Sequence, residues 1–415
     1  MWVRERWRRL LLFLAVMGPG VITGNVDNDA NGIATYSVAG AEYGYGLLWT
    51  LFFSTVTLAL VQEMVARMGA VTGKGLADLI RERFRVRLTV LIMSILVLAN
   101  WANTVGDFAG VAGSMEIFGV SRYLTVPLAA LLVGVLVVRG SYRVVERVFL
   151  GATVIYVTYI VSAVLADPPW GQVLRATVTP TFKFEAPYLA LVVGLVGTTV
   201  APWMQFYQQA AVVDKGIGEK DYAYARLDTY LGVISLNAIA FFIVVACGAT
   251  LFIHGVRITD AKDAALALVP LAGRYAATLF AIGLLNAAVF SVAIIPLSTA
   301  YTVCEAFGWE AGLDRTVREA PIFVGLYMGM IALSALVILV PGVPLIPVML
   351  LSQVLNGMLL PFVLIFILVL INDRQIMGEY RNSRFINIAS AITILVIILL
   401  AVLLLGTSVR ALLGS

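Results

Sequence analysis

The sequence predicts an all-α integral membrane protein that crosses the bilayer many times. Hydrophobic residues make up 61% of its 415 residues and charged residues only 13%, about half the charged share of a typical soluble domain. Apolar runs recur along the whole length, and each is long enough to cross about 30 Å of hydrocarbon. We therefore expect a single transmembrane domain over residues 1–415 and no separate soluble domain.

Eleven spans follow from the apolar runs when glycine, proline and charge clusters are taken as their limits. The first run follows the basic segment Arg4–Arg9 and continues into Asp27 without the cleavage site of a signal peptide, so we interpret it as a transmembrane helix. The spans are expected near residues 10–40, 46–70, 88–117, 121–138, 144–166, 187–213, 227–254, 275–306, 320–341, 345–371 and 385–411.

The distribution of Lys and Arg predicts the orientation of these spans. Most of the 28 basic residues lie at the N-terminus and in the connections after every second span, with the largest group between residues 67 and 87. Because cytoplasmic loops carry the excess of Lys and Arg, we expect a cell-membrane protein with a cytoplasmic N-terminus and an extracellular C-terminus. The net charge of +4 then reflects topology, so neither a nucleic-acid partner nor an obligate protein partner is indicated.

Polar and helix-breaking residues interrupt two spans at their middle. The first span holds Asp27–Gly32, with two aspartates, and the sixth holds Gly197–Trp203, with Pro202 inside it. A charged residue at the bilayer centre costs about 3 kcal/mol unless it faces a cavity or a partner. Irregular backbone at that depth survives only where it is buried in protein or lines a water-filled cavity. We expect the first helix to be unwound at Asp27–Gly32 and the two breaks to form one binding site.

Breaks in the first and sixth spans predict two inverted repeats of five helices around a central site. Helices 1–5 would occupy about residues 10–166, helices 6–10 about 187–371, and helix 11 about 385–411. Freed carbonyls at such breaks can coordinate cations, which favours an ion transporter.

Other classes of membrane protein fit less well. A sodium-coupled amino-acid transporter of the same architecture is possible, but two acidic residues at the first break would repel a substrate carboxylate. A channel is disfavoured by eleven unequal spans and two broken helices. No nucleophile–base pair is visible in the spans, so we expect no enzyme, no catalytic residues and no cofactor.

Several short stretches resemble the Nramp family of divalent-metal transporters, in the same order and at similar spacing through most of the chain. They are Gly18–Gly20, Gly44–Trp49, Ala66–Gly69, Thr72–Ala77, Ser352–Val354 and Pro361–Phe362. The resemblance implies a LeuT-type fold, with helices 1 and 6 broken at mid-membrane, and transport of a divalent metal ion by alternating access.

The resemblance also implies which residues bind the metal. The family's first-helix motif Asp-Pro-Gly-Asn corresponds to Asp29–Gly32, which keeps the aspartate but has glycine in place of the asparagine. Its sixth-helix motif Met-Pro-His corresponds here to Ala-Pro-Trp. The candidate metal-binding residues are Asp29, Thr198 through its carbonyl, Ala201, Gln353, Asn356 on the same helical face, and Asp27, with Gly32 and Trp203 shaping the cavity.

These departures from the family pattern indicate the cargo. A methionine thioether is a soft ligand that favours transition metals, and Ala201 removes it. Gly32 enlarges the cavity, and what remains is a site of oxygen ligands. Because Mg²⁺ is hard and usually keeps several waters, the sequence predicts uptake of partly hydrated Mg²⁺, with Mn²⁺ also admitted. In these motifs the chain resembles the Nramp-related magnesium transporter branch.

The residues that couple Nramp transporters to protons are mostly missing. Two histidines of helix six are replaced by Trp203 and Gln208, and of an Asp and a Glu on helix three only Asp107 persists, with Gly110 at the other place. A proton relay needs titrating groups within reach of one another. We therefore expect uncoupled transport, with a proton-coupled Mn²⁺/Fe²⁺ transporter as the alternative.

Overall fold

The computed structural model describes residues 18–139, 153–312 and 317–413, and these residues form helices joined by turns and short loops, with no strand among them. Eight helical stretches of the described chain are long and apolar enough to cross a membrane. Two shorter apolar helices, Arg122–Val135 and Val154–Leu165, lie where the fourth and fifth spans are expected. The predicted α-helical membrane architecture is confirmed, while the count of eleven spans stays a prediction. The start of the first span and residues 144–152 of the fifth lie outside the described residues.

The elements of the first half surround the first break and include the second. They are α2 (Pro19–Asp27), α3 (Ala30–Tyr43), α4 (Leu48–Thr72), α5 (Leu76–Arg83), α6 (Val86–Glu116), α7 (Arg122–Arg139), the 3-10 turn η1 (Thr153–Tyr156), α9 (Val157–Leu165), α10 (Trp170–Val178), α11 (Ala186–Thr199) and α12 (Pro202–Asp214).

The second half continues with longer helices. They are η2 (Glu219–Asp221), α13 (Tyr222–Cys247), the π-helical turn η3 (Gly248–Phe252), α14 (Ala261–Ala265), η4 (Leu266–Leu268), α15 (Val269–Ala272), η5 (Gly273–Tyr275), α16 (Ala276–Phe307), α17 (Pro321–Ile338), α18 (Leu345–Asn372), α19 (Arg374–Met377), η6 (Gly378–Tyr380) and α20 (Arg384–Leu413).

Both predicted breaks are present. The helix pair α2 and α3 is interrupted at Asn28 and Asp29, and the pair α11 and α12 at Val200 and Ala201. The first break is shorter than the expected Asp27–Gly32, because the Asp29 carboxylate accepts a hydrogen bond from the backbone N–H of Gly32 and so starts a new helix at once. The unwound segment is therefore two residues long, and Gly32 lies in the first turn of α3.

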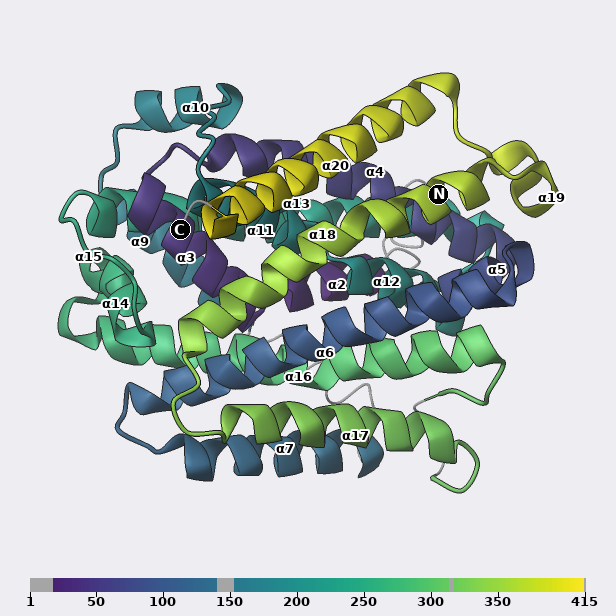
Figure 1. Cartoon of the computed structure of the whole chain (residues 1–415), viewed down its shortest axis with the longest axis horizontal. Helices are drawn as coiled ribbons and strands as arrows, with labels where there is room; N and C mark the ends of the chain where they lie inside the picture. Colours follow the sequence, from purple (N-terminus) through teal and green to yellow (C-terminus); the bar gives the residue numbers. More distant parts are fainter. Residues whose placement is uncertain (1–17, 140–152, 313–316, 414–415) are drawn as a thin grey trace, which may run out of the picture.

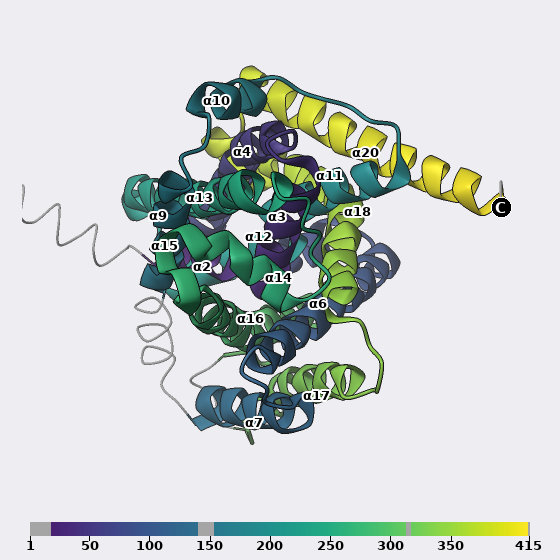
Figure 2. The same cartoon turned by 90° about the vertical axis from the view of Figure 1, so that its left-hand side faces the viewer.

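The four half-helices form the centre of the molecule. In Figures 1 and 2, α2, α3 and α12 lie inside a ring that includes α6, α13, α16 and α18, while α7 and α17 lie together at one edge. Side chains of α3 are buried from Ala30 to Ala41, and those of α11 from Tyr188 to Thr199 apart from Ala190. The candidate site is thus enclosed by protein on all sides, as an irregular backbone in a membrane requires.

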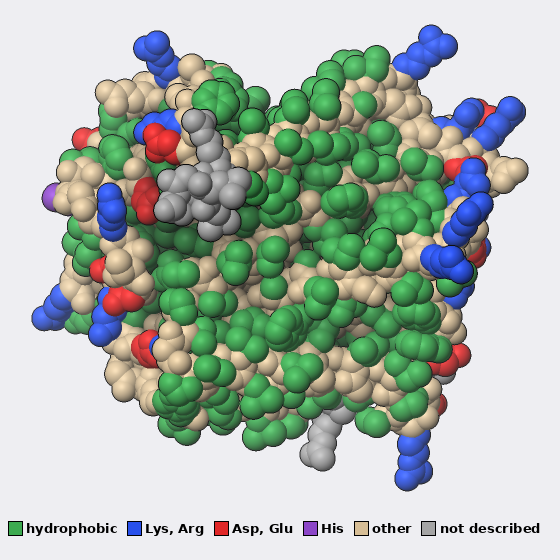
Figure 3. Space-filling model, in the orientation of Figure 1, with side chains coloured by type: hydrophobic (Ala, Val, Ile, Leu, Met, Phe, Trp, Pro, Cys, Tyr) green, Lys and Arg blue, Asp and Glu red, His purple; other side chains and the backbone are tan. Residues whose placement is uncertain are grey.

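The molecule has two polar ends and an apolar middle. Figure 3 shows hydrophobic side chains over the broad central face and charged side chains gathered at the two edges. One edge carries α5 and α19 and is called the α5 end below, and the other carries α14 and α15 and is called the α14 end. This pattern is what a bilayer-spanning protein presents to lipid tails and to water.

Glycines and one carboxylate hold α2 against α13. A Cβ on Gly24 would lie 2.5 Å from the carbonyl oxygen of Gly232, and a Cβ on Gly232 would lie 2.1 Å from that of Gly20. Only glycine permits so close an approach of two helices. The Asp228 carboxylate of α13 accepts hydrogen bonds from the backbone N–H groups of Gly18 and Gly20, at 3.1 and 2.7 Å. This contact fixes the start of α2 and, through the helix, the position of the break.

Candidate metal-binding site

Asp29 is the centre of the first break, and its carboxylate is buried and held from two sides. It is 3% exposed. Oδ1 accepts from the backbone N–H of Gly32, and Oδ2 accepts from Nδ2 of Asn31 at 3.1 Å. Asp29 is also the N-cap of the 14-residue helix α3, so its carboxylate faces the positive end of the helix dipole. A carboxylate that is fixed in this way at mid-membrane can bind a cation.

The two breaks meet at the space left by Gly32. A Cβ on this glycine would lie 3.0 Å from Oδ1 of Asp29, 3.0 Å from Oγ1 of Thr198 and 3.1 Å from the carbonyl oxygen of Asp27. Three oxygens, from α2, from the first break and from α11, therefore lie around the position that a side chain of residue 32 would take. The structure brings together four residues that the sequence nominated, although Thr198 presents its hydroxyl here and was predicted to act through its carbonyl. Contacts this short leave no room for a side chain, so the wider cavity predicted from Gly32 stays a prediction.

A chain of amides links Asp29 to α6 and α18. Nδ2 of Asn31 lies 3.0 Å from Oδ1 of Asp107 and 3.0 Å from the carbonyl oxygen of Asn103. Oδ1 of Asn103 accepts from Nε2 of Gln353 at 2.7 Å, whose Oε1 accepts from Nδ2 of Asn356 at 3.2 Å. The two candidates on α18 thus share a face, as predicted, and join the same buried network.

Asn31 and Asn103 were missed by the sequence reasoning. Asn31 stands inside the first-helix motif, but the family has glycine there. Asn100, Asn103 and Asp107 lie three or four residues apart in an otherwise apolar span, which places them on one helical face. That spacing was the signal that could have found Asn103.

Several buried oxygens of this cluster have no hydrogen-bond partner within the described part of the chain. They are Oδ2 of Asp27, Oδ1 of Asn31, Oδ2 of Asp107 and Oδ1 of Asn356. Each such group costs about 1–3 kcal/mol when it is buried away from water, and a cation with its waters would satisfy them. This donor set of carboxylate and amide oxygens fits a hard divalent ion. No group of three His, Cys, Asp or Glu side chains among the described residues is arranged to hold a metal ion, so amides are needed to complete a site.

The remaining candidates lie at the second break. Ala201 precedes α12 in extended conformation, and its carbonyl accepts from Nε2 of Gln205 at 3.2 Å. Trp203 is 1% exposed, and its ring centroid lies 6.1 Å from that of Tyr207. No hydrogen bond joins either residue's side chain to the Asp29 cluster. Their roles as a metal-binding and a cavity-shaping residue stay predictions.

A cavity of about 240 Å³ approaches the site from the α14 end, between α3, α11 and α18. Three of its lining residues are close in the sequence to candidate site residues. Thr35 lies one turn from Gly32, Gly194 lies one turn from Thr198, and Val354 is next to Gln353. The cavity therefore ends about one helical turn from the carboxylate, which itself stays buried.

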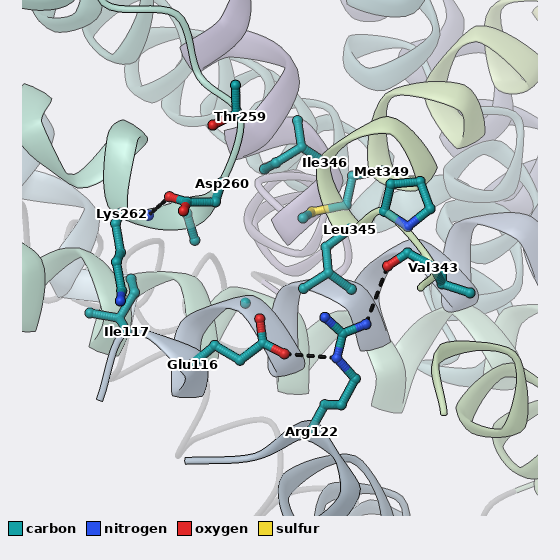
Figure 4. A pocket seen from close by; sticks show the side chains of 13 residues that line it. Glu116, Ile117, Arg122, Thr259, Asp260, Lys262, Val343, Leu345, Ile346 and Met349 are labelled. Carbon is teal, nitrogen blue, oxygen red and sulfur yellow. Dashed lines mark hydrogen bonds and ion pairs between the residues drawn. The ribbon is translucent and has the colours of Figure 1, made fainter. Parts of the chain in front are cut away.

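A second cavity of about 250 Å³ opens at the same end between α6, α14 and α18 (Figure 4). Nε of Arg122 donates to Oε1 of Glu116 at 2.7 Å, and Nη1 donates to the carbonyl oxygen of Val343 at 3.2 Å. These contacts tie α7 to the end of α6 and to the loop before α18. On α18, the second cavity is lined by Leu345, Ile346 and Met349, ahead of Gln353, whereas the first is lined by Leu350 and Val354, on either side of Gln353.

Comparison with known proteins identifies similar sequences along nearly the whole chain. The family described as "Natural resistance-associated macrophage protein-like", or Nramp, matches residues 20–407. A "Divalent metal cation transporter MntH" of Verminephrobacter eiseniae is 28% identical over 93% of this chain and 88% of its own length. One of the same name from Ralstonia nicotianae is 30% identical over 91% of this chain and 87% of its own length.

Solved structures share the fold. The manganese transporter of Eremococcus coleocola superposes with a TM-score of 0.75 over 95% of this chain and 86% of its own, at 22% sequence identity. The nucleobase-cation-symport-1 family transporter Mhp1 superposes with a TM-score of 0.60 over 95% of this chain and 91% of its own, at 16% identity. At these identities the likeness establishes the arrangement of helices.

Proposed function

We propose, from the premise that this chain belongs to the Nramp family of divalent-metal transporters, that its cargo is partly hydrated Mg²⁺, with Mn²⁺ also admitted. One observation carries the proposal: oxygens of Asp29, Thr198 and Asp27 converge within 3.1 Å of one point beside Gly32. A site built from oxygen ligands suits a hard ion that dehydrates reluctantly and keeps several of its waters. Ala201 has no thioether sulfur, so the site lacks the soft ligand that would favour transition metals over Mg²⁺.

Transport is proposed to be independent of protons. Gln208, at a position of a coupling histidine, does not titrate, and it bridges α2 and α13 by accepting from Thr23 at 2.8 Å and donating to Thr229 at 3.2 Å. The second helix-three carboxylate cannot be restored without rearrangement, because a Cβ on Gly110 would lie 2.2 Å from the Cβ of Ala30. A divalent ion gains about 4.6 kcal/mol on entering a cell at −100 mV, so uptake needs no second driving ion.

The α5 end is proposed to face the cytoplasm. It carries Arg81, Arg83 and Lys74 together with α19, and positive charge favours the cytoplasmic side. The cavity of about 240 Å³ then opens to the outside, and the ion would enter past Thr35. Alternating access would next have to open a route along α2 and α12, where Asp228 and Gln208 now hold the helices together.

Proton-coupled transport of Mn²⁺ is the second candidate. The relatives are named divalent metal cation transporters, which is compatible with Mn²⁺ as cargo, and Asp107, one of the two family carboxylates for coupling, is present beside the site. Against it stand the missing thioether and the packing of Gly110.

Flux measurements in liposomes separate the two candidates. The protein is reconstituted with a Mg²⁺-sensitive dye and a pH dye inside, and a K⁺ diffusion potential is set with the inside negative. Mg²⁺ influx without internal acidification is expected. Asp29→Ala, checked for monodisperse folding, serves as the inactive control. Mn²⁺ influx with acidification and no Mg²⁺ influx would establish the second candidate instead.

A further inference from the structure

Two backbone carbonyls at the end of α2 are occupied by hydroxyl groups of neighbouring elements. Oγ of Ser291, on α16, donates to the carbonyl oxygen of Val26 at 3.0 Å. The hydroxyl of Tyr156, on η1, donates to the carbonyl oxygen of Asn28 at 3.1 Å. Both donors are fully buried. These carbonyls flank the break, where unwound backbone otherwise offers its oxygens to a cation.

Backbone carbonyls at the second break also accept hydrogen bonds from side chains. The carbonyl of Ala201 accepts from the Gln205 amide at 3.2 Å, and that of Trp203 accepts from Oγ of Ser298 at 3.3 Å. Four carbonyls beside the candidate site are therefore already hydrogen-bonded by side chains. The carbonyl of Asp27 and the side chains of Asp27, Asp29, Thr198 and Asn356 are left to supply the oxygens.

We infer that Ser291 and Tyr156 are selectivity-determining residues, which keep the carbonyls of Val26 and Asn28 out of the ion's inner coordination sphere and so disfavour Ca²⁺. The inference rests on the proposed transport of a hydrated divalent ion. The two residues act through the backbone that they hold, so they are positioning residues and need not touch the ion.

The physical reason lies in how the two ions are coordinated. Ca²⁺ takes six to eight oxygen ligands at about 2.3–2.6 Å in flexible geometry, whereas Mg²⁺ keeps several waters and uses one or two carboxylates. A carbonyl that accepts a hydrogen bond from a fixed hydroxyl is held in direction and has one lone pair engaged. Withholding two such oxygens leaves too few protein ligands to replace the water shell of Ca²⁺, while a partly hydrated Mg²⁺ does not require them.

The test compares Ca²⁺ and Mg²⁺ influx into liposomes for Tyr156→Phe, Ser291→Ala and the double variant. Each single change removes one hydroxyl and little volume. Loss of one cap of ordinary hydrogen-bond strength should raise the Ca²⁺/Mg²⁺ influx ratio about threefold, and loss of both about tenfold. Ser291→Thr keeps a hydroxyl and should restore the wild-type ratio.

Two matched controls are available. Tyr159→Phe removes the hydroxyl of a buried tyrosine one turn away, and this hydroxyl has no partner within the described residues. Ser162→Ala removes a hydroxyl that donates at 2.8 Å to the carbonyl of Ala267, a residue that belongs to neither break. Both should leave the ratio at its wild-type value.

Two results would overturn the inference: an unchanged ratio in folded, active single variants, or an equal loss of Ca²⁺ and Mg²⁺ influx, which indicates a structural role. If the double variant cannot be purified, the Tyr156→Phe result alone decides. If wild-type protein carries Mn²⁺ but no Mg²⁺, the proposed cargo is wrong, and the Ca²⁺/Mn²⁺ ratio in the same variants then tests the capping of the carbonyls independently.

Discussion

Filling the space beside Asp29 should weaken Mg²⁺ transport without unfolding the protein. Gly32→Ala places a methyl group 3.0 Å from both Oδ1 of Asp29 and Oγ1 of Thr198. These distances are shorter than ordinary carbon–oxygen contacts, so the methyl group pushes the two oxygens away from the position in which they would face the ion. Weakening one contact to the ion by about 1 kcal/mol should raise KM for Mg²⁺ about fivefold.

The same substitution should cost little stability. Gly32 lies in the first turn of α3 and has no positive φ, and alanine favours a helix over glycine by up to about 1 kcal/mol. This gain offsets the tight contacts, so the melting temperature in detergent should stay close to that of wild type. Gly325→Ala, on α17 with no atom near the added methyl group, is the matched control and should leave KM unchanged.

The ion dependence gives the sharper result. Mg²⁺ dehydrates reluctantly, whereas Mn²⁺ gives up its waters more readily and can therefore adapt to a more crowded site. The KM for Mn²⁺ should rise less than the KM for Mg²⁺. Initial influx rates in liposomes over a range of each ion measure both values. An unchanged KM for Mg²⁺ in a folded Gly32→Ala protein would show that the oxygens beside Gly32 do not face the ion, and the proposed site would have to be abandoned.

Three further changes test the site and its frame. Ala201→Met adds a thioether and should raise the Cd²⁺/Mg²⁺ influx ratio; no change would mean that this position does not face the ion. Gly110→Ala should lower stability by about 1–3 kcal/mol, because its methyl group overlaps α3; a melting temperature equal to the Gly325→Ala control would contradict the packing. The Gln375 N–H and the Arg83 ion pair at 2.6 Å lower the pKa of Asp373. Its contribution to stability is therefore present above about pH 4 and is lost as pH falls through the lowered pKa, so Asp373→Asn should reduce the drop in melting temperature between pH 5 and pH 3.

The two breaks were predictable from the sequence because charged and helix-breaking residues rarely occur together inside an apolar run unless the helix is interrupted there. Asp29 was placed correctly at the first break, and Gln353 and Asn356 were placed correctly on one face. The length of the break was overestimated, since the capping hydrogen bond of Asp29 depends on local geometry that polar composition does not reveal. The rotation of α6, which turns Asn103 toward Asn31, depends on the packing of several helices and could not be deduced from one span.

Asn31 explains how two aspartates can stand close together in an apolar environment. Its amide group hydrogen-bonds to both Asp29 and Asp107, so one neutral side chain offers its N–H groups to two carboxylates. The fit is specific, because a Cβ on Gly106 would lie 2.0 Å from Oδ1 of Asn31. The side-chain amide of Asn31 neither takes up nor releases a proton near neutral pH. The contact that links Asp29 to helix α6 therefore passes through a group that does not titrate, and this supports the proposed proton-independent transport.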